Sequence, residues 1–338
     1  MSFIVRPVEP RDLEALYQMA KSTGGGFTNL PPDRPTLKGK VERSAASFAR
    51  KGDDLADDFF MFVLENAETG KVRGTNQIFA RIGSTWPFYS YRISTMTQSS
   101  KELNRTFRAE MLTLCTDLDG SSEIGGLFLH PGERSAGIGK LLARSRYMFI
   151  GMHRERFADR TLAELRGALD EAGSSPFWDG VPGRFFGMSF QEADNFNALN
   201  GNQFIADLMP KHPIYTAMVP ETARAVMGMP HHSGRAAMRM LEEEGFRYDG
   251  YIDIFDGGPT MVARTDRIKA IRKARTLPVT ATGDRGEMPT HLIAHGRLGQ
   301  FRACLGDAVA GDEGVVIDRA SAGMLGVGAG DSVMITPR

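Results

Sequence analysis

The sequence of 338 residues has little of several features that mark specialised classes of protein. Its 41 basic residues are balanced by 41 acidic ones, so no general attraction to nucleic acid or to anionic lipid is expected. No apolar run approaches the roughly 18 residues of a membrane span. The N-terminus lacks the charged-then-apolar segment of a signal peptide. These absences predict a folded cytoplasmic protein that binds neither nucleic acid nor membranes.

Cysteine is also scarce, with Cys115 and Cys304 far apart in the chain. Their separation matches no metal or redox spacing, so we expect two isolated thiols rather than a disulfide. The sequence contains no metal-ligand spacing of useful specificity. No metal and no permanently bound cofactor are therefore expected.

The pattern of apolar residues predicts a mixed α/β (α+β) chain of two or three domains. In the first half, strands and helices are expected in the order β-α-α-β-β-β-β-β-α, with a helix break at Gly24–Gly26. The second half is predicted to be helix-rich over residues 163–244, with two strands to follow. Thr276–Pro289 is a candidate linker, and the short Gly-separated runs after it predict an all-β tail. The expected domains are residues 1–165, 166–275 and 276–338.

One strand–loop–helix segment carries the clearest chemical signal. A strand is predicted to end at His130, and a loop with Arg134, Gly137 and Gly139 leads into an amphipathic helix. The first turn of a helix has unpaired N–H groups and a partial positive charge. Glycines leave those groups accessible, and the arginine adds a full charge, so the segment can bind a diphosphate. The alternative is that two glycines simply turn the chain.

This segment is more specific than its glycines alone. It differs from a Walker loop, which needs Gly-Lys-Ser/Thr, and from a dinucleotide fingerprint, whose third glycine is absent. The complete strand–Arg-x-x-Gly-x-Gly–helix unit resembles the pyrophosphate-binding loop of GNAT acyltransferases. That resemblance implies that the backbone amides of four residues hold the diphosphate of coenzyme A: Gly137, Ile138, Gly139 and Lys140.

Further segments of the chain resemble the arginine N-succinyltransferase family in sequence and in order. The resemblance covers residues 1 to about 275 and is looser in the tail, which is similar to small double-psi-type barrels. It implies a GNAT-type mixed sheet flanked by helices, a second α/β half and a small β-barrel-like C-terminal domain. The segments that carry it are Lys21–Pro31, Ser99–Asn104, Ser174–Trp178, Met209–Tyr215, Glu244–Tyr248 and Tyr251–Thr260.

By this resemblance, the chain moves the succinyl group of succinyl-CoA, its co-substrate, to the α-amine of L-arginine. Leu127 is expected to contact succinyl-CoA, and His231 to be the catalytic proton donor. The sequence departs from the family pattern at Gly125–Gly126 and at Pro230, and the first departure lies where the acyl group is expected. A homo-oligomer, or a hetero-oligomer with a related subunit, is also expected.

Acyl transfer to an amine needs a base, stabilisation of the oxyanion and a proton donor for the departing thiolate. The α-amine is mostly protonated at neutral pH, so a base must free it. Backbone N–H groups at the end of a core strand can stabilise the oxyanion, and the candidates are Leu127, Phe128 and Leu129. No Cys–His or Ser–His constellation has local motif support, so we expect direct attack in a ternary complex.

Each candidate for proton transfer has a plainer interpretation. His231 is expected near a helix N-terminus, which disfavours its charged form. It could instead cap that helix, and the adjacent His232 is equally eligible. Glu123 is the other candidate base, and its alternative is a partly exposed strand residue paired with an arginine.

The substrate-binding candidates rest on charge alone. A guanidinium calls for carboxylates, and Asp253 and Asp256 around a Gly-Gly turn are the leading candidates. They could equally be turn-forming aspartates. Lys21 and Arg92 are candidates for the succinyl carboxylate, with ordinary surface charges as the alternative.

Two other functions stay open on the sequence. The same fold could use acetyl- or succinyl-CoA to acylate ornithine or another amine. The chain could also be a non-catalytic partner subunit that has kept the loop and His231. Room and a cation near Gly125–Gly126 would favour the dicarboxylic acyl group.

Overall fold

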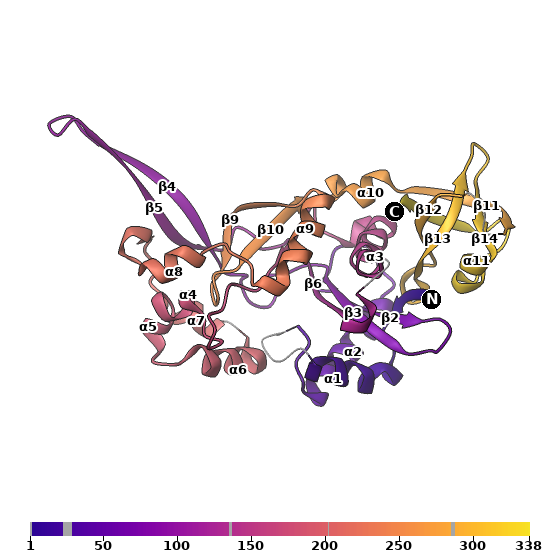
Figure 1. Cartoon of the computed structure of the whole chain (residues 1–338), viewed down its shortest axis with the longest axis horizontal. Helices are drawn as coiled ribbons and strands as arrows, with labels where there is room; N and C mark the ends of the chain where they lie inside the picture. Colours follow the sequence, from indigo (N-terminus) through magenta and orange to yellow (C-terminus); the bar gives the residue numbers. More distant parts are fainter. Residues whose placement is uncertain (1, 23–28, 135–136, 202, 285–287) are drawn as a thin grey trace. The chain divides into compact units, whose positions relative to one another are not determined.

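The computed structural model describes residues 2–22, 29–134, 137–201, 203–284 and 288–338. The chain forms two compact units, each assembled from segments that are distant in the sequence (Figure 1). Unit 1 contains residues 1–81, 122–161 and 264–338, and unit 2 contains residues 82–121 and 162–263. The chain passes between the units within β7 (Arg160–Glu164) and β10 (Pro259–Arg264), among other places.

Unit 1 is built on a sheet with the strand order β12-β15-β11-β14-β13-β1-β2-β3-β6. Its strands are β1 (Phe3–Pro7), β2 (Phe59–Asn66), β3 (Val72–Phe79), β6 (Ser122–Leu129), β11 (Arg275–Gly283), β12 (Thr290–His295), β13 (Arg302–Ala310), β14 (Val315–Asp318) and β15 (Ser332–Pro337). Its helices are α1 (Leu13–Ser22), α2 (Arg34–Ala49), α3 (Ile138–Met152), α10 (Lys269–Lys273) and α11 (Arg319–Leu325).

Alternation along β2 explains why helices cover both faces of this sheet. Successive side chains of a strand point to opposite faces. Phe59 and Met61 pack in one core cluster with residues of α1 and α2. Phe60 and Phe62 instead contact Phe149 of α3, with ring centroids 4.9 and 5.0 Å away. Because both faces of β2 are apolar, the strand is buried between the two helical layers.

The end of unit 1 closes on itself. The strands β11 to β15 pair in the order β12-β15-β11-β14-β13, and β12 also pairs with β13, which completes a five-stranded barrel. Such closure leaves no free sheet edge. The predicted barrel-like tail is confirmed, and it also contains the helix α11, whose N-cap Asp318 accepts from the Ser321 amide at 3.0 Å.

Unit 2 has a smaller sheet, of order β10-β9-β4-β5-β8, beside a group of short helices. Its strands besides β10 are β4 (Ser90–Ser100), β5 (Arg105–Cys115), β8 (Ile214–Tyr215) and β9 (Arg247–Asp253). Its helices are α4 (Pro176–Gly180), α5 (Gly183–Phe186), α6 (Phe190–Asn200), α7 (Gln203–Leu208), α8 (Glu221–Val226) and α9 (Arg235–Glu244). Their apolar core centres on Trp178, which stacks with Phe186 and contacts Phe255.

The mixed α/β fold and the β-α-α-β-β-β-β-β-α order of the first half are confirmed. The linker predicted at Thr276–Pro289 is wrong over its first part, which forms β11 and pairs with β14 and β15. Its polar residues lie on the exposed side of the barrel while Val279 is buried, so low hydrophobicity did not mean a loop. The predicted helix break at Gly24–Gly26 lies outside the described residues. The three predicted domain boundaries stay a prediction.

The structure can be compared with what the sequence indicated about the cysteines, about membrane-spanning helices and about metal ligands. Cys115 and Cys304 are both free thiols, as predicted. Within the described residues, no helix combines the length and hydropathy needed to span a bilayer. The same residues contain no group of three or more side chains suited to holding a metal ion.

Candidate active site

A β-bulge distorts β6 where the acyl group was expected. Gly126 and Leu127 of β6 together lie opposite a single residue of β3, Asn76. Gly126 has a φ of 57°, and a β-carbon there would collide with the side chain of Gln77. Glycine is therefore required, which accounts for one of the two departures from the family pattern. The bulge interrupts the regular hydrogen-bond ladder between β3 and β6 next to Leu127.

The loop after β6 leads into the start of α3, whose N-cap residue is a glycine. Gly137 is the N-cap of α3, with a φ of 81°, and it has no side chain with which to cap the helix. The amides of Ile138 and Gly139 follow in the uncapped first turn. The Lys140 amide is bonded to the Gly137 carbonyl at 3.0 Å, so it is less available than the other amides. Arg134 is exposed and donates to the Leu129 carbonyl over 3.4 Å.

Glu123 lies deeper than its plainer interpretation assumed. It is buried at the start of β6, opposite Phe79 of β3, rather than partly exposed. Its carboxylate acts on Lys40 of α2, whose ammonium donates to the Asn29 carbonyl at 3.0 Å. Burial lowers the pKa of Lys40 to about 8, and the nearby Glu123 opposes that shift. The Glu123 carboxylate therefore lies close enough to the half-buried Lys40 amine to affect its protonation.

His231 of unit 2 is held in a defined orientation. Its amide donates to the Arg166 carbonyl at 2.7 Å, and its Nδ1 accepts from the Ser233 amide at 3.4 Å. Nδ1 also lies 2.8 Å from the Ser233 hydroxyl. Because the amide is an obligatory donor, Nδ1 is the acceptor and the proton of the neutral ring is on Nε2. The ring is a cap, as one alternative had it, and its Nε2 side is left for other partners.

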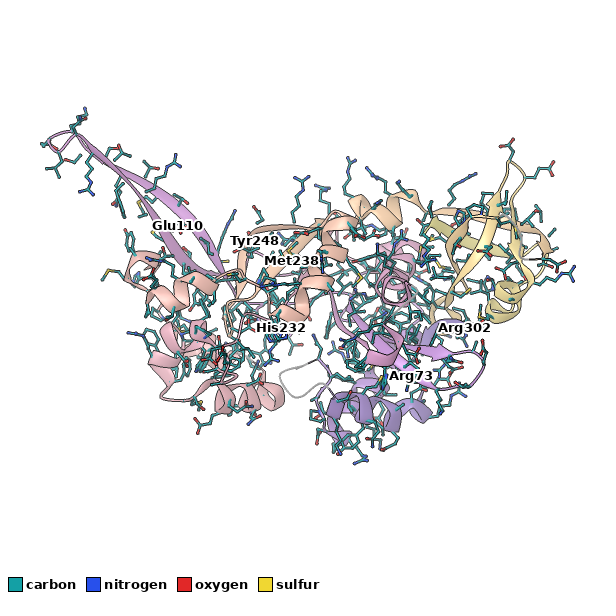
Figure 2. The ribbon with its side chains drawn as sticks, viewed as in Figure 1. Arg73, Glu110, His232, Met238, Tyr248 and Arg302 are labelled. Carbon is teal, nitrogen blue, oxygen red and sulfur yellow. The ribbon has the colours of Figure 1, made fainter. Side chains whose placement is uncertain are left out.

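The surroundings of His231 keep its ring neutral. Partial burial lowers the pKa of His231, and the adjacent His232 and Arg166 lower it further. The two imidazole centroids are 4.0 Å apart, and Figure 2 labels His232. From the sequence, a helix N-terminus was expected to lower this pKa. Burial, His232 and Arg166 lower it instead. Pro230, the second departure from the family pattern, bridges to Gly167 and fixes the start of this turn.

The two aspartates form a hydrogen-bonded turn. One oxygen of Asp253 accepts from the amides of Phe255 and Asp256, at 2.7 and 2.9 Å. Asp256 accepts from the Gly167 amide at 2.7 Å and from the Gly258 amide at 2.8 Å. Burial, and then the charge of Asp253, raise the pKa of Asp256. These contacts match the turn-forming alternative, and a role in binding guanidinium stays a prediction.

The two predicted cations for the succinyl carboxylate are surface residues of different units. Lys21 is exposed at the end of α1, with its ammonium 5.7 Å from the ring centroid of Tyr17. Arg92 on β4 is paired with Asp117 at 3.4 Å and lies over the Tyr251 ring. Both positions match ordinary surface charges, and their role in binding stays a prediction.

Comparison with known proteins identifies the family. The model for "Arginine N-succinyltransferase beta subunit" matches residues 3–270, and the model for its C-terminal domain matches residues 275–337. The chain belongs to the arginine N-succinyltransferase family. It is 43% identical over 334 residues to the arginine N-succinyltransferase of Citrobacter koseri, covering 98% of this chain and 96% of the relative. An Escherichia coli relative of the same name is 42% identical over 335 residues, with the same coverage.

A solved structure of the family has the same fold. Arginine/ornithine succinyltransferase subunit AI from Pseudomonas aeruginosa superposes with a TM-score of 0.91 at 34% sequence identity. The superposition covers 99% of this chain and 98% of that one. The family resemblance inferred from the sequence is thereby confirmed over the full length, including the tail where the resemblance was looser.

Sequence reasoning missed a cation at the loop before α3 of this succinyltransferase chain. The guanidinium of Arg338 lies against Gly137, where a β-carbon would collide with it. The end of the chain is held there partly by Arg144 of α3, which donates to the Pro337 carbonyl at 2.8 Å. No local pattern connects positions so far apart in the sequence. The barrel thus supplies a charged group beside the N-terminus of α3.

Sequence reasoning also missed a buried arginine next to the bulge. Arg146 of α3 is 4% exposed, and its guanidinium donates to the carbonyls of Ala143 at 3.0 Å and Gly125 at 3.4 Å. Burial lowers the pKa of Arg146. Among the described residues, no carboxylate forms an ion pair with it. The apolar stripe of α3 was interpreted as core. A charged residue within that core was the signal that could have revealed Arg146.

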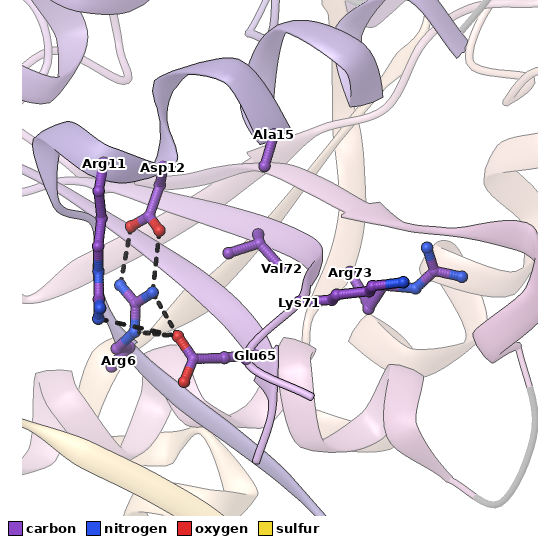
Figure 3. Close-up of a pocket in the computed structure, with 9 residues that line it drawn as sticks. Arg6, Arg11, Asp12, Ala15, Glu65, Lys71, Val72 and Arg73 are labelled. Carbon is purple, nitrogen blue, oxygen red and sulfur yellow. Dashed lines mark hydrogen bonds and ion pairs between the residues drawn. The ribbon is translucent and has the colours of Figure 1, made fainter. Parts of the chain in front are cut away.

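A surface pocket of unit 1 contains none of the predicted site residues (Figure 3). Arg6 crosses its floor and donates to both oxygens of Asp12, at 2.8 and 2.9 Å, and to Glu65 at 2.8 Å. These partners raise the pKa of Arg6 in spite of its burial. The acidic groups of the pocket are thus engaged in joining β1, β2 and the start of α1, which is a structural role.

Proposed function

We propose that this chain transfers the succinyl group of succinyl-CoA to the α-amine of L-arginine. The observation that carries the proposal is the sequence of features along β6 and α3. A bulge at Gly126–Leu127 is followed by a loop with uncapped amides and a cation. A thioester with a charged diphosphate tail needs both, in this order along the strand. The names of the relatives support arginine as the acceptor.

The choice of a dicarboxylic acyl group is supported by Arg146. Gly125 precedes Leu127 by two residues on β6, and the bulge between them makes their separation shorter than in a regular strand. A succinyl group attached at a thioester near Leu127 can therefore extend toward Gly125. Arg146 supplies a buried cation at the Gly125 carbonyl, while the side chains of Asn29 and Glu123 lie beside Gly125. A buried cation without an ion pair is costly, and an anionic ligand offsets that cost.

His231 is proposed to move the proton in this reaction. The amine nitrogen of arginine attacks the thioester carbonyl, and the neutral imidazole accepts the proton that the nitrogen loses. The C–S bond then breaks, and the imidazolium returns that proton to the departing thiolate, which leaves as CoA thiol. The lowered pKa of His231 keeps the ring able to accept at neutral pH. Backbone amides near Leu127 stabilise the oxyanion formed between these steps.

The decisive experiment measures release of free CoA thiol from succinyl-CoA by the purified chain, with and without L-arginine. We expect arginine-dependent release with succinyl-CoA and far less with acetyl-CoA. Release with ornithine in place of arginine tests the second acceptor, which the name of the Pseudomonas aeruginosa relative includes. The absence of release with either amine and either donor would refute catalysis by this chain alone and favour a partner-subunit role.

Replacing Arg146 tests the choice of donor separately from catalysis. Loss of a charge-assisted hydrogen bond to the carboxylate should lower kcat/KM for succinyl-CoA by roughly 10- to 100-fold in Arg146→Met. Turnover of acetyl-CoA should be unchanged or higher, and Arg146→Lys should recover part of the succinyl-CoA activity. An equal loss with both donors would show that Arg146 supports the fold and does not select the acyl group.

Two expectations accompany this proposal. A cytoplasmic location fits a reaction that consumes a CoA thioester. Assembly into an oligomer, either of identical chains or with a related subunit, stays a prediction that the names of the relatives, which contain the word subunit, make worth testing.

A further inference from the structure

The hairpin of β4 and β5 extends beyond every other element of unit 2. The two strands pair continuously from Ser90↔Cys115 to Ser100↔Arg105. β9 pairs with β4 only at Ser90–Arg92, and β8 pairs with β5 only at Met111 and Leu112. From Ile93 to Glu110 the hairpin is a two-stranded ribbon, drawn as a long projection in Figure 1. We call residues 93–110 the arm.

The arm lacks the support that such a ribbon needs. Almost every residue from Thr95 to Arg108 is exposed, and Figure 2 shows its side chains projecting with no other element of unit 2 beside them. Met96, Leu103 and Phe107 are 39%, 74% and 52% exposed. An isolated two-stranded hairpin is marginally stable in water and needs further strands or a packed face. The arm is therefore built to be completed by a partner.

The two edges of the arm differ in charge, and this difference indicates which edge pairs and with which partner. The β5 edge carries Arg105, Arg108 and Glu110, and charges on an edge discourage pairing with another strand. The β4 edge reads Ile-Ser-Thr-Met-Thr-Gln-Ser-Ser over residues 93–100, with no charge and no proline. Its threonines and serines suit a strand, and its backbone groups are unprotected.

We propose that the β4 edge of the arm pairs antiparallel with the same edge of a second copy of this chain. An uncharged strand meets itself without like-charge repulsion, whereas two β5 edges would bring arginines together. Antiparallel pairing of identical strands has two-fold symmetry, so it closes at a dimer and does not propagate. The product is a four-stranded ribbon whose charged β5 strands form the new outer edges. This dimer is independent of the proposed activity.

The test begins with the mass of the full-length chain in solution, measured by sedimentation over a range of concentrations. We expect a dimer. A double variant, Met96→Lys with Gln98→Lys, places like charges along the β4 edge, opposite the uncharged Ala109 and Phe107 of β5. Like charges on paired strands should raise the dimer dissociation constant by roughly fivefold or more at low salt. Phe107→Lys puts the same charge on the neighbouring strand and should leave the dimer intact.

Charge complementation decides whether the two edges touch. The double variant Met96→Glu with Gln98→Glu should also dissociate alone, and an equimolar mixture of the lysine and glutamate variants should restore the dimer. A monomeric wild-type chain would overturn the proposal. A dimer that resists both double variants, or two monomeric variants that do not recombine, would overturn it as well. Circular dichroism and arginine-dependent CoA release check that the variants are folded, since neither position belongs to the proposed site.

Discussion

Two polar regions, one in each unit, use their hydrogen-bonding groups in opposite ways. In unit 1, the loop before α3 presents amide donors at an uncapped helix start, beside the guanidinium of Arg338. In unit 2, Asp253 and Asp256 use their oxygens on the amides of their own turn and of Gly167. The oxygens of the second region already accept backbone hydrogen bonds, whereas the N-cap of the first is a glycine without a capping side chain. The first region is therefore the better candidate for binding an anion.

The largest expected effect on activity comes from replacing His231. Its Nδ1 lies against the amide and hydroxyl of Ser233, and among the described residues no hydrogen bond to its Nε2 is formed. His231→Gln should lower kcat by roughly 10²- to 10⁴-fold, because the step that moves the proton loses its acid and base. Succinyl-CoA binding, measured by calorimetry, should stay near the wild-type value. His232→Ala is the matched control, and equal losses in the two variants would contradict the assignment.

Replacing Asp256 tests the turn in unit 2, where both oxygens of this carboxylate already accept backbone hydrogen bonds. In Asp256→Asn one oxygen becomes an NH₂ group that faces a backbone donor, so the variant should lose about 1–3 kcal/mol of unfolding free energy. Denaturant unfolding measures this loss. The KM for arginine should not change if the carboxylate serves the turn. A KM that rises tenfold in a variant of normal stability would instead establish Asp256 as a contact for guanidinium.

The sequence predicted the fold best where local patterns and tertiary packing agree. The strand that begins at Phe59 and the strand–loop–helix order around Gly137 were predicted from local patterns, and both appear in the structure. The strand β11 was missed because the barrel, and not its own composition, makes it a strand. The exposed arm shows the same limit, since the order of strands predicted for the first half gave no sign that most of the hairpin extends past its sheet.

The site divides along similar lines. The loop residues could be proposed from the sequence because a helix start that binds anions needs glycine and adjacent cations in sequence. Arg146 and Arg338 were not predictable, because tertiary contacts alone bring the first to Gly125 and the second to Gly137. The bulge at Gly126 lies between these cases: a glycine pair in a strand hinted at it, and only the register with β3 established it.

Replacing Gly137 tests the loop before α3, and the expected effect on activity is smaller. Alanine at a φ of 81° is strained by roughly 1–2 kcal/mol, and its methyl group would displace Arg338. Gly137→Ala should therefore raise the KM for succinyl-CoA by about tenfold or less. Gly187→Ala is the control, because Gly187 has a φ of 62° with open space around it and lies outside the loop. A KM unchanged in Gly137→Ala would show that the loop does not hold the donor.

The prediction with the smallest expected effect separates the causes of the lowered pKa of His231. Partial burial is the main cause of its lowered pKa, followed by His232 and Arg166. If the neutral ring is the active form, kcat at saturating arginine falls as the pH drops through the pKa of His231, which lies below the ordinary 6.5. His232→Ala removes one positive neighbour and so raises that pKa, which moves the acidic limb of the kcat profile to higher pH. A limb that stays in place in His232→Ala and persists in His231→Gln would belong to another group, and Lys40 with its neighbour Glu123 would be the next to replace.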